Sequence, residues 1–361
     1  MKQPKRIVLT GGACAGKTTG LVRIWDRLEK MGWHPIVVPE VATLMFRAAG
    51  RPNFSDRVQC LLFQKAMIKA QLQLEETMLE LAQSYPKAVL LLDRGAMDSK
   101  AFLAAEDWQM LLQEVGTNEV ELRDLRYDAV IHMVTAADGA PDAYKLDDIR
   151  TETPQQAIAQ DQRLQAAYLG HGHHKIIDNH GTFDQKLLRV EAEICRILGD
   201  PEPLELERKF LLRNSPLKFT SHCASSTITQ TYLKSATDEE RRVRRRIYNN
   251  NAVYTKGLKR KLGNGLRVEV EEFISGTEYL RLLETAADPK AETITKTRHC
   301  FIHDNRVYEL DEYTGRLQGL WVLEIEVENM DTPVVLPGWA QNATEVTNNT
   351  AYSNYGLAHK K

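Results

Sequence analysis

The sequence predicts an α/β domain built on a parallel sheet, followed by an α+β domain that consists mostly of antiparallel strands. At 361 residues the chain is longer than most single domains. Short β-rich runs alternate with longer helical patterns over residues 1–198, as in parallel sheets with crossover helices. From residue 204 onward, strand-like runs follow one another directly. We therefore expect two domains, over residues 1–200 and 201–361.

The strands of the first domain are predicted from its apolar, β-branched runs at 6–10, 34–40, 88–93, 128–134 and 175–178. Apolar residues at three- and four-residue spacing predict a long helix over 54–84. A last helix over 183–198 is followed by "DPEP", whose prolines and acids indicate a domain boundary. The run "HGHH" (171–174) matches no common metal-ligand spacing, so we expect a polar loop there.

The second domain is predicted to contain strands at 204–213, 227–234, 241–248, 252–259, 266–274, 293–301, 306–313 and 321–328. A single clear helical pattern, over 276–287, interrupts them. The runs "YNNNA" (248–252) and "LGNG" (262–265) carry the residues that tight hairpins prefer.

Composition limits the partners that we expect. A net charge of -2 supplies no global attraction toward nucleic acid or anionic membrane. With 43% hydrophobic and 27% charged residues, the chain has the composition of a soluble globular protein. No apolar run is long enough to span a bilayer. Five scattered cysteines without a CxxC pair favour reduced thiols. We expect a cytoplasmic protein without a nucleic-acid partner or stable membrane association.

A phosphate-binding loop is the first candidate site. The run "GGACAGKT" matches G-x-x-x-x-G-K-[ST] and lies between the strand "RIVLT" and a helical segment that begins at "TTGLVRIW". Backbone N–H groups of such a loop surround phosphates. Lys17 is expected to reach the terminal phosphates, and the Thr18 hydroxyl to hold Mg²⁺. The predicted nucleotide-binding residues of the loop are Gly11, Gly12, Ala13, Cys14, Ala15, Gly16, Lys17, Thr18 and Thr19.

Three further residues complete the predicted nucleotide site. Asp93 and Arg94 follow a buried strand, where phosphate-loop enzymes carry a second Mg²⁺-associated carboxylate. Arg150 lies in the segment where small-molecule kinases carry a lid with charge-stabilising arginines, whereas Arg163 is expected to be solvated. Glu40 also ends a strand at the ligand edge of the sheet. A helix cap explains a strand-end acid equally well.

The first domain resembles a known family through the motifs "TGGACAGKTT", "VPEVA", "LLDRGAMD", "IRTE" and "IIDN". Over residues 5–198 it is similar to the AAA-type, nicotinamide-riboside-kinase-like part of bacterial NAD-regulator proteins. The resemblance implies a P-loop NTPase fold that binds ATP or GTP with Mg²⁺, and phosphoryl transfer with Glu40 or Asp93 near the acceptor.

The second candidate site is a charged strand face. In "EPLELERKFLL", Glu205, Glu207 and Lys209 alternate with other residues and therefore share one face. An isolated strand of this kind is explained by a half-buried sheet with its charges in water. The alternation recurs, however, in "RRVRRRIY", "LRVEVEEF", "TKTRH", "VYELDEY" and "VLEIEVE". Because the opposite faces are apolar and must be buried, we expect a β-barrel whose charges line a tunnel and pair there with each other and with ligands.

This ordered series resembles the CYTH family, the triphosphate tunnel metalloenzymes, over about 204–358, beginning with the motif ExExK. The resemblance implies Mg²⁺- or Mn²⁺-dependent hydrolysis of tripolyphosphate or a nucleoside triphosphate, with Glu205, Glu207 and Lys209 as catalytic residues. Lys256, Lys259 or Lys261 could supply the tunnel lysine, and alternation from Thr255 favours Lys259. The implied phosphate-binding residues are Arg242, Arg244, Arg246, Lys259, Arg267, Lys296 and Arg298. The implied metal ligands, besides Thr18 in the loop, are Glu205, Glu207, Glu269, Glu271, Glu309, Asp311, Glu324 and Glu326.

The combination of both domains is similar to the animal proteins typified by the insect TRP-channel translocation-defect protein, which are associated with GTP and phosphoinositide binding. A triphosphate or polyphosphate hydrolase is therefore the first hypothesis. A GTP- or ATP-regulated switch that binds a phosphorylated ligand such as a phosphoinositide is the second, and a small-molecule, nucleoside-type kinase is the third. For the tunnel, hydrolysis is favoured over adenylate cyclisation.

Overall fold

The structure is a computed structural model that describes residues 3–145, 152–199, 206–216, 223–236, 239–263 and 266–360, without the side chains of 261–268. The chain divides into two compact units, Met1–Leu198 and Gly199–Lys361. The predicted boundary motif "DPEP" (200–203) lies outside the described residues.

A five-stranded parallel sheet forms the centre of the first unit, with the order β2-β3-β1-β4-β5. Its strands are β1 (Lys5–Gly11), β2 (His34–Val38), β3 (Ala88–Asp93), β4 (Ala129–Met133) and β5 (His174–Ile177). The predicted parallel sheet is confirmed, whereas the "HGHH" loop is wrong at its last residue, because His174 is buried in β5. Strands β2 and β3 lie on one side of β1, and β4 and β5 lie on the other. The carboxyl end of β1 is therefore the switch point where ligands of such sheets bind.

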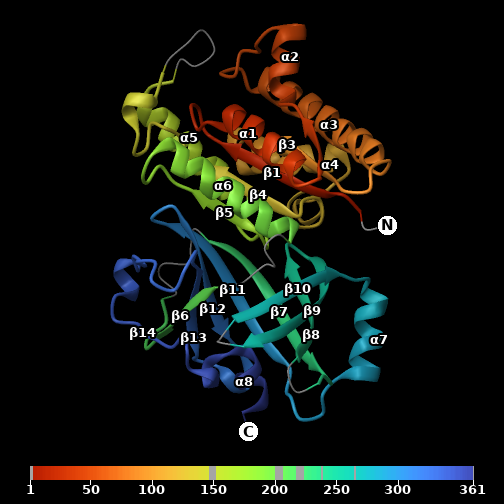
Figure 1. Cartoon of the computed structure of the whole chain (residues 1–361), viewed down its shortest axis with the longest axis vertical. Helices are drawn as coiled ribbons and strands as arrows, with labels where there is room; N and C mark the ends of the chain where they lie inside the picture. Colours follow the sequence, from red (N-terminus) through yellow and green to blue (C-terminus); the bar gives the residue numbers. More distant parts are fainter. Residues whose placement is uncertain are drawn as a thin grey trace. The chain divides into compact units, whose positions relative to one another are not determined.

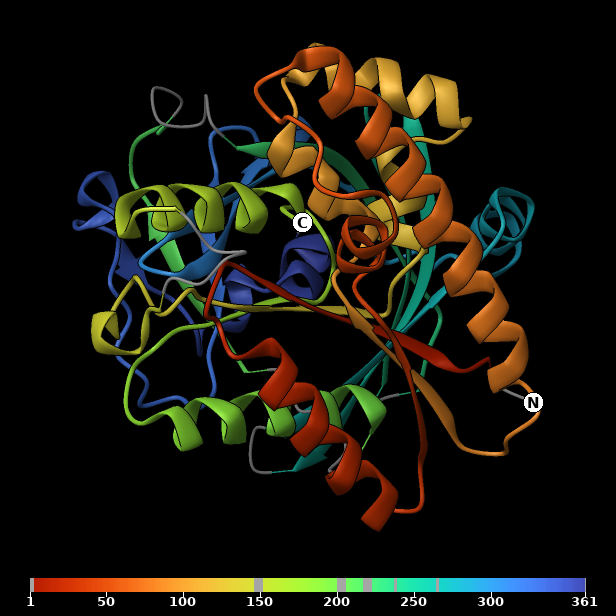
Figure 2. The same ribbon diagram turned by 90° about the horizontal axis from the view of Figure 1, so that it is seen from above.

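Helices cover both faces of this sheet, as Figure 2 shows. Ile7 and Leu9 of β1 face a core with α1 and α6, while Val8 between them faces a core with α3, α4 and α5. The helices are α1 (Lys17–Lys30), α2 (Val41–Ala49), α3 (Arg57–Ala82), α4 (Ala105–Val115), α5 (Pro154–Ala167) and α6 (Phe183–Leu198). Shorter helical segments are η1 (Ala96–Phe102), η2 (Val120–Leu125) and η3 (Pro141–Ala143).

The second unit is built on a nine-stranded antiparallel sheet with the order β10-β9-β8-β7-β11-β12-β13-β6-β14. Its first five strands in the chain are β6 (Glu207–Leu212), β7 (Ala224–Leu233), β8 (Glu239–Tyr248), β9 (Asn251–Gly263) and β10 (Leu266–Phe273). The remaining strands are β11 (Ile294–His303), β12 (Arg306–Tyr313), β13 (Trp321–Glu326) and β14 (Thr344–Glu345). Helices α7 (Gly276–Ala286) and α8 (Asn354–His359) and the short η5 (Gly315–Leu317), η6 (Gly338–Ala340) and η7 (Thr350–Tyr352) complete the unit.

Tight turns set the register of two hairpins in this sheet. Asn249 and Asn250, at φ 44° and 63°, join β8 to β9 and confirm the predicted turn at 248–252. Asp304 and Asn305, at φ 50° and 52°, join β11 to β12 in the same way. The second predicted turn, at 262–265, lies partly outside the described residues.

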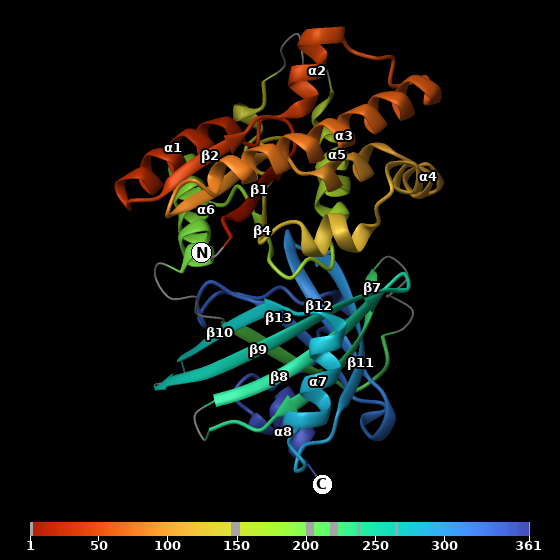
Figure 3. The same cartoon turned by 90° about the vertical axis from the view of Figure 1, so that its right-hand side faces the viewer.

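One face of the antiparallel sheet is apolar and covered. Phe210, Leu310 and Leu323 pack with the segment from Val334 to Ala343, and Val243 packs with α7. Figures 1 and 3 show α7 along the outside of β8 and β9. Lys209 and Glu324, which alternate with residues of this apolar face in β6 and β13, lie on the other face. None of the helices in the described part of the chain combines the length and apolarity needed to cross a membrane.

Candidate functional site

The loop between β1 and α1 has the backbone that its glycines predict. Gly11 and Gly16 have φ values of 143° and 90°. A Cβ on Gly11 would lie 2.0 Å from the Met133 carbonyl oxygen, and one on Gly16 would lie 2.5 Å from the Phe183 ring. Larger residues are therefore excluded at both positions. The first turn of α1, which begins at Lys17, follows the loop, so free N–H groups of the helix end are available to an anion.

Lys17 lies at the centre of the loop. Its Nζ donates to the carbonyl oxygens of Gly11 at 3.0 Å and of Gly12 at 3.2 Å. Burial lowers the pKa of Lys17 to about 8, and the charge of Arg94 lowers it as well, whereas nearby carboxylates such as Asp93 act in the opposite direction. The loop therefore holds a partly desolvated cation, which strengthens its attraction for a phosphate.

Asp93, Arg94 and Glu40 meet beside this lysine. The buried Oδ1 of Asp93 has no hydrogen-bond partner among the described residues, and burial raises the pKa of its carboxyl group. Arg94 has a φ of 72°, unusual for a residue with a side chain. Its Nε donates to Glu40 at 2.5 Å, and its Nη1 donates to Asp98 at 3.0 Å. Two carboxylates thus hold the guanidinium in place and support its strained backbone.

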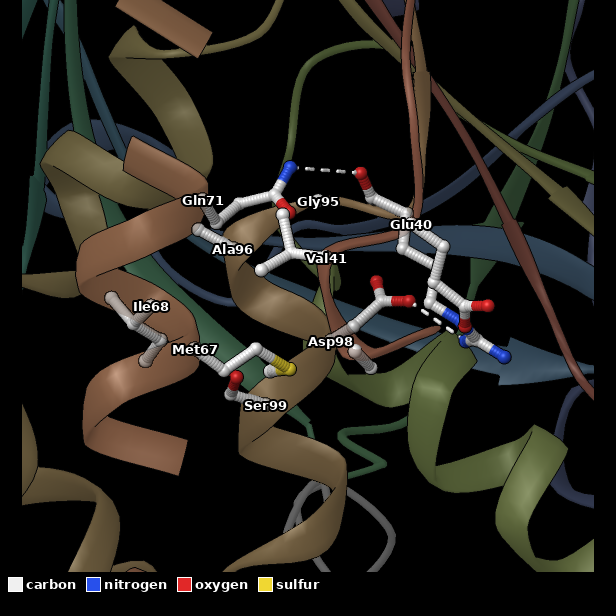
Figure 4. A pocket seen from close by; sticks show the side chains of 11 residues that line it. Glu40, Val41, Met67, Ile68, Gln71, Gly95, Ala96, Asp98 and Ser99 are labelled. Atoms are coloured by element: carbon white, nitrogen blue, oxygen red, sulfur yellow. Dashed lines mark hydrogen bonds and ion pairs between the residues drawn. The ribbon is translucent and has the colours of Figure 1, made fainter. Parts of the chain in front are cut away.

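A small pocket with a volume of about 20 Å³ adjoins these residues. In Figure 4, Met67 and Ile68 of α3 lie on one side, and Glu40 and Asp98 lie on the other. One wall is apolar and the other is acidic. The volume has room for about one water, so an organic ligand would need the pocket to widen.

Several residues of this site have little sequence signal. Asp98 is 2% exposed and accepts from Thr10 Oγ1 at 2.7 Å and from Tyr168 Oη at 2.8 Å. Its place four residues after Arg94 is the only local indication of its role. Asp161 of α5 accepts from the Gly12 N–H at 2.6 Å, a contact that the chain makes only through its fold. The predicted lid residue Arg150 lies outside the described residues, and the side chain of Arg163 is exposed, as expected.

A cluster of carboxylates and a lysine forms the charged face of the second unit. Lys209 Nζ lies 2.7 Å from Glu207 Oε2 and also pairs with Glu324. Burial and the neighbouring Glu324 raise the pKa of Glu207 to about 7, against the effect of Lys209 and Lys259. Burial alone would raise the pKa of Glu324, but three cations, Lys209 first, hold it well below its ordinary value. Glu205 lies outside the described residues.

Arg298 connects this cluster to β12. Its Nε and Nη2 donate to the two oxygens of Asp311 at 2.8 and 2.7 Å, and Nη2 also donates to Glu324 at 2.7 Å. Glu309 pairs with the same guanidinium. Lys296 is 1% exposed and pairs with Asp311, so its charge is already compensated within the protein.

A second cluster, richer in arginine and lysine, occupies β8, β9 and β10. Lys259 Nζ lies 2.5 Å from Glu269 Oε2, and Arg244 Nη1 lies 3.3 Å from Glu271 Oε1. Arg242 pairs with Glu269 and lies 3.8 Å from Glu271. The two acids predicted to bind metal from β10 therefore neutralise bases predicted to bind phosphate.

The alternation in β9 distinguishes Lys259 from its neighbours. Lys256 pairs with Glu272 at 3.1 Å, and both side chains are largely exposed. Lys259 shares the charged face with Arg242 and Glu269 instead. The orientation predicted for Lys259 is thus the observed one.

The two clusters face each other because the sheet curves. Lys259 in β9 and Glu207 in β6 are six strands apart in the sheet, or roughly 29 Å if it were flat. The charge of Lys259 nevertheless lowers the pKa of Glu207, which requires a much shorter distance. Figure 1 shows β8–β10 on one side of the unit and β6, β12 and β13 on the other. No pairing among the described residues joins the outer strands β10 and β14.

The remaining predicted site residues lie at the margins. Arg246 is half-buried at the end of β8, and Glu326 is exposed at the end of β13, opposite Glu207. Arg267 is in β10, but its side chain is outside the described part of the structure. Thr18 is exposed on the first turn of α1. Within the described ranges, no three His, Cys, Asp or Glu side chains are grouped so that they could hold a metal ion.

Comparisons with known proteins find similarity to inorganic triphosphatases and, separately, to the AAA domain family. An inorganic triphosphatase of Acetivibrio thermocellus is 29% identical over 154 residues, which cover 42% of this chain and 92% of the relative. A solved inorganic triphosphatase is 27% identical over 44% of this chain and 95% of its own, with a TM-score of 0.33. A solved protein of Pyrococcus horikoshii is 20% identical over 35% of this chain and 80% of its own, with a TM-score of 0.28. The AAA domain family matches residues 6–186, half of the sequence, and the chain therefore belongs to the AAA domain family.

Proposed function

We propose that the second unit hydrolyses a triphosphate inside a tunnel, formed by closure of its antiparallel sheet into a barrel, while the first unit binds a nucleotide. The observation that carries this proposal is the pair of charged clusters in the antiparallel sheet, one with Glu207, Lys209 and Glu324 and the other with Arg242, Lys259 and Glu269. Similarity to the inorganic triphosphatase of Acetivibrio thermocellus supports hydrolysis. Its 154 matched residues would fit within the second unit, Gly199–Lys361.

The basic cluster is suited to hold the polyphosphate chain. Arg242, Arg244 and Lys259 are paired with two glutamates, which a bound triphosphate would replace as hydrogen-bond acceptor. Guanidinium groups match phosphate oxygens with two parallel hydrogen bonds, so phosphate oxygens can satisfy both arginines in place of the carboxylates. Fixing these cations before the substrate arrives reduces the ordering cost of binding.

The acidic cluster is suited to a divalent cation such as Mg²⁺ or Mn²⁺. Glu207 and Glu324 are hydrogen-bonding neighbours, and the Lys209 ammonium already bridges them as a positive charge. Carboxylate oxygens are the ligands that such ions prefer. Glu207 and Glu324, with Glu205 from the preceding residues, would hold the ion, which when bound would neutralise phosphate charge and acidify water. Lys209 keeps the two carboxylates together, and Glu207, with a pKa of about 7, can exchange a proton near neutral pH.

Phosphate release from tripolyphosphate, ATP and GTP, with Mg²⁺ or Mn²⁺, tests the proposal. Glu207→Gln should abolish release, because the amide has the same shape but no charge. Glu345→Gln is the matched control, since Glu345 pairs with Arg208 and its side chain is 40% exposed. Lys17→Ala should leave tripolyphosphate hydrolysis intact. Full activity of a folded Glu207→Gln protein would remove the chemistry from the tunnel.

A second candidate function is phosphoryl transfer by the first unit. Lys17 and Asp93 adjoin an arginine that is fixed between Glu40 and Asp98, next to a pocket with an acidic wall. This arrangement would place an acceptor hydroxyl beside the terminal phosphate. ADP formation from ATP that requires added nucleosides, and that disappears in Glu40→Gln, would support a kinase.

A regulatory role is the third proposal, since the pairing of both units in one chain resembles the animal two-domain proteins that are associated with GTP and phosphoinositide binding. In that case GTP or ATP on the first unit controls the second. Binding of GTP and of anionic, phosphorylated ligands without any phosphate release would favour this switch over a hydrolase.

A further inference from the structure

Side chains from two other segments of the first unit form hydrogen bonds with the backbone in the first half of the phosphate loop. The Gly12 N–H donates to Asp161 Oδ1 of α5 at 2.6 Å. Thr135, which follows β4, donates from its Oγ1 to the Ala13 carbonyl oxygen at 2.6 Å. Asp161 and Thr135 are 2% and 0% exposed, so water does not compete for either contact.

The same contacts explain why residue 12 is a glycine. Gly12 lies outside the left-handed region that Gly11 and Gly16 occupy, so its backbone does not by itself require glycine. An added Cβ would, however, lie 2.6 Å from Asp161 Oδ1 and 3.0 Å from the Thr135 Cβ. Glycine at this position therefore permits Asp161 to approach the loop.

Asp161 is tied to further buried groups. Its Oδ1 also lies 3.0 Å from His132 Nε2, and its Oδ2 accepts from Gln165 Nε2 at 3.0 Å. His132 lies in β4 and is 0% exposed. Burial alone would raise the pKa of Asp161, but His132 and the hydrogen-bond donors, among them Gly12, bring it below its ordinary value. The buried group is thus an ionised carboxylate, fully engaged by its neighbours.

The charge of Asp161 is unfavourable for an anionic ligand nearby, which indicates that its role is geometric. A carboxylate close to a phosphate site repels the ligand unless a cation or several donors compensate it. Here His132 and the surrounding donors supply that compensation. The protein itself thus engages the Gly12 N–H and the Ala13 carbonyl, so the part of the loop that precedes α1 is fixed before any phosphate binds.

We propose that Asp161 and His132 are positioning residues for the phosphate loop, which hold its first half in the conformation that binds a nucleotide without touching the nucleotide. The inference rests on the proposed binding of ATP or GTP by the first unit. Its physical content is preorganisation, in which the protein rather than the ligand fixes the loop.

The test compares the dissociation constants of ATP, ADP and AMP for the full chain by calorimetry, with GTP in parallel. Asp161→Asn should weaken triphosphate binding by about 10- to 100-fold, as expected for loss of a charged hydrogen bond that supports a site. The loss should shrink from ATP to AMP, since fewer phosphates depend on the loop. His132→Leu should have a similar effect, and His132→Gln, which keeps a donor near Nε2, should restore most of the affinity.

Asp124→Asn is the matched control, because Asp124 is 3% exposed and pairs with Arg123 rather than with the loop. It should lower thermal stability and leave the dissociation constants unchanged. An equal loss of affinity in Asp124→Asn, or unchanged ATP binding in a folded Asp161→Asn protein, would overturn the positioning role of Asp161 and His132. Nucleotide binding by the first unit would still stand. Absence of nucleotide binding by the wild-type protein would overturn nucleotide binding by the first unit as well.

Discussion

Removal of Arg298 should destabilise the second unit far more than removal of an arginine on its outer face. Arg298 donates two parallel hydrogen bonds to Asp311 and a third to Glu324, and it also pairs with Glu309. Its side chain is 13% exposed, and Asp311 is fully buried. Arg298→Met keeps much of the apolar stem but leaves these carboxylates without their shared cation.

The expected cost follows from burial. Loss of one partner from a buried ion pair costs about 3–5 kcal/mol, because the remaining charge is desolvated and unpaired. Lys296 still pairs with Asp311, and Lys209 with Glu324, so we expect the lower end, about 3 kcal/mol. This corresponds to roughly a hundredfold increase in the population of the open state.

Arg208→Met is the control for this prediction. Arg208 makes the same paired contacts with Glu345, at 2.8 and 2.6 Å, but on the opposite face, where 40% of the Glu345 side chain is exposed. An exposed pair of this kind contributes below about 1 kcal/mol. The two variants therefore differ in the burial of the lost ion pair and in the number of carboxylates that lose an arginine, which is three for Arg298 and one for Arg208. Arg208 also donates from Nη1 to the Thr332 carbonyl oxygen at 3.0 Å.

Native-state hydrogen exchange, measured by mass spectrometry, follows the two units separately. Amide hydrogens of β11–β13 should exchange much faster in Arg298→Met than in Arg208→Met, and those of β1–β5 should be unaffected. Equal effects of the two substitutions, or a cost below about 1 kcal/mol for Arg298→Met, would mean that the charged face is solvated. The interpretation of that face as the interior of a tunnel would then be refuted.

Three further predictions concern the loop, the basic cluster and acid stability. Gly12→Ala should weaken ATP binding measured by calorimetry, because the new Cβ would lie 2.6 Å from Asp161 Oδ1. Lys259→Met should raise the KM for tripolyphosphate about tenfold or more, as a phosphate loses a charged partner that is now 2.5 Å from Glu269. Burial holds the pKa of His174 well below 6.5, so below pH 6.5 the imidazole is protonated in the unfolded chain but not in the folded one. The free energy of unfolding therefore decreases as the pH drops below 6.5. In urea unfolding between pH 7 and 5, His174→Phe should reduce the slope of the free energy of unfolding against pH by up to about 1.4 kcal/mol per pH unit.

Sequence patterns alone were sufficient to predict the local features of both sites. The phosphate loop depends on Gly11 and Gly16, whose positive φ angles and close neighbouring atoms exclude residues with a Cβ. Strand alternation placed Glu207 beside Lys209, and their 2.7 Å ion pair confirms that both lie on one face. The parallel and antiparallel sheets were likewise predicted from the order of helical and β-rich runs. All these features depend on contacts within a few residues or on backbone periodicity.

The tertiary structure decided which distant side chains meet. Asp161 contacts Gly12 across 149 residues of sequence, and Tyr168 contacts Asp98 across 70, so no local pattern could identify either pair. Alternation predicted a charged face but could not divide it into an acidic cluster and a basic cluster. That division depends on strand order and on the curvature that brings Lys259 toward Glu207. Sequence periodicity specifies the direction of each side chain, whereas long-range packing determines its partner, and the partner determines its charge state and its chemistry.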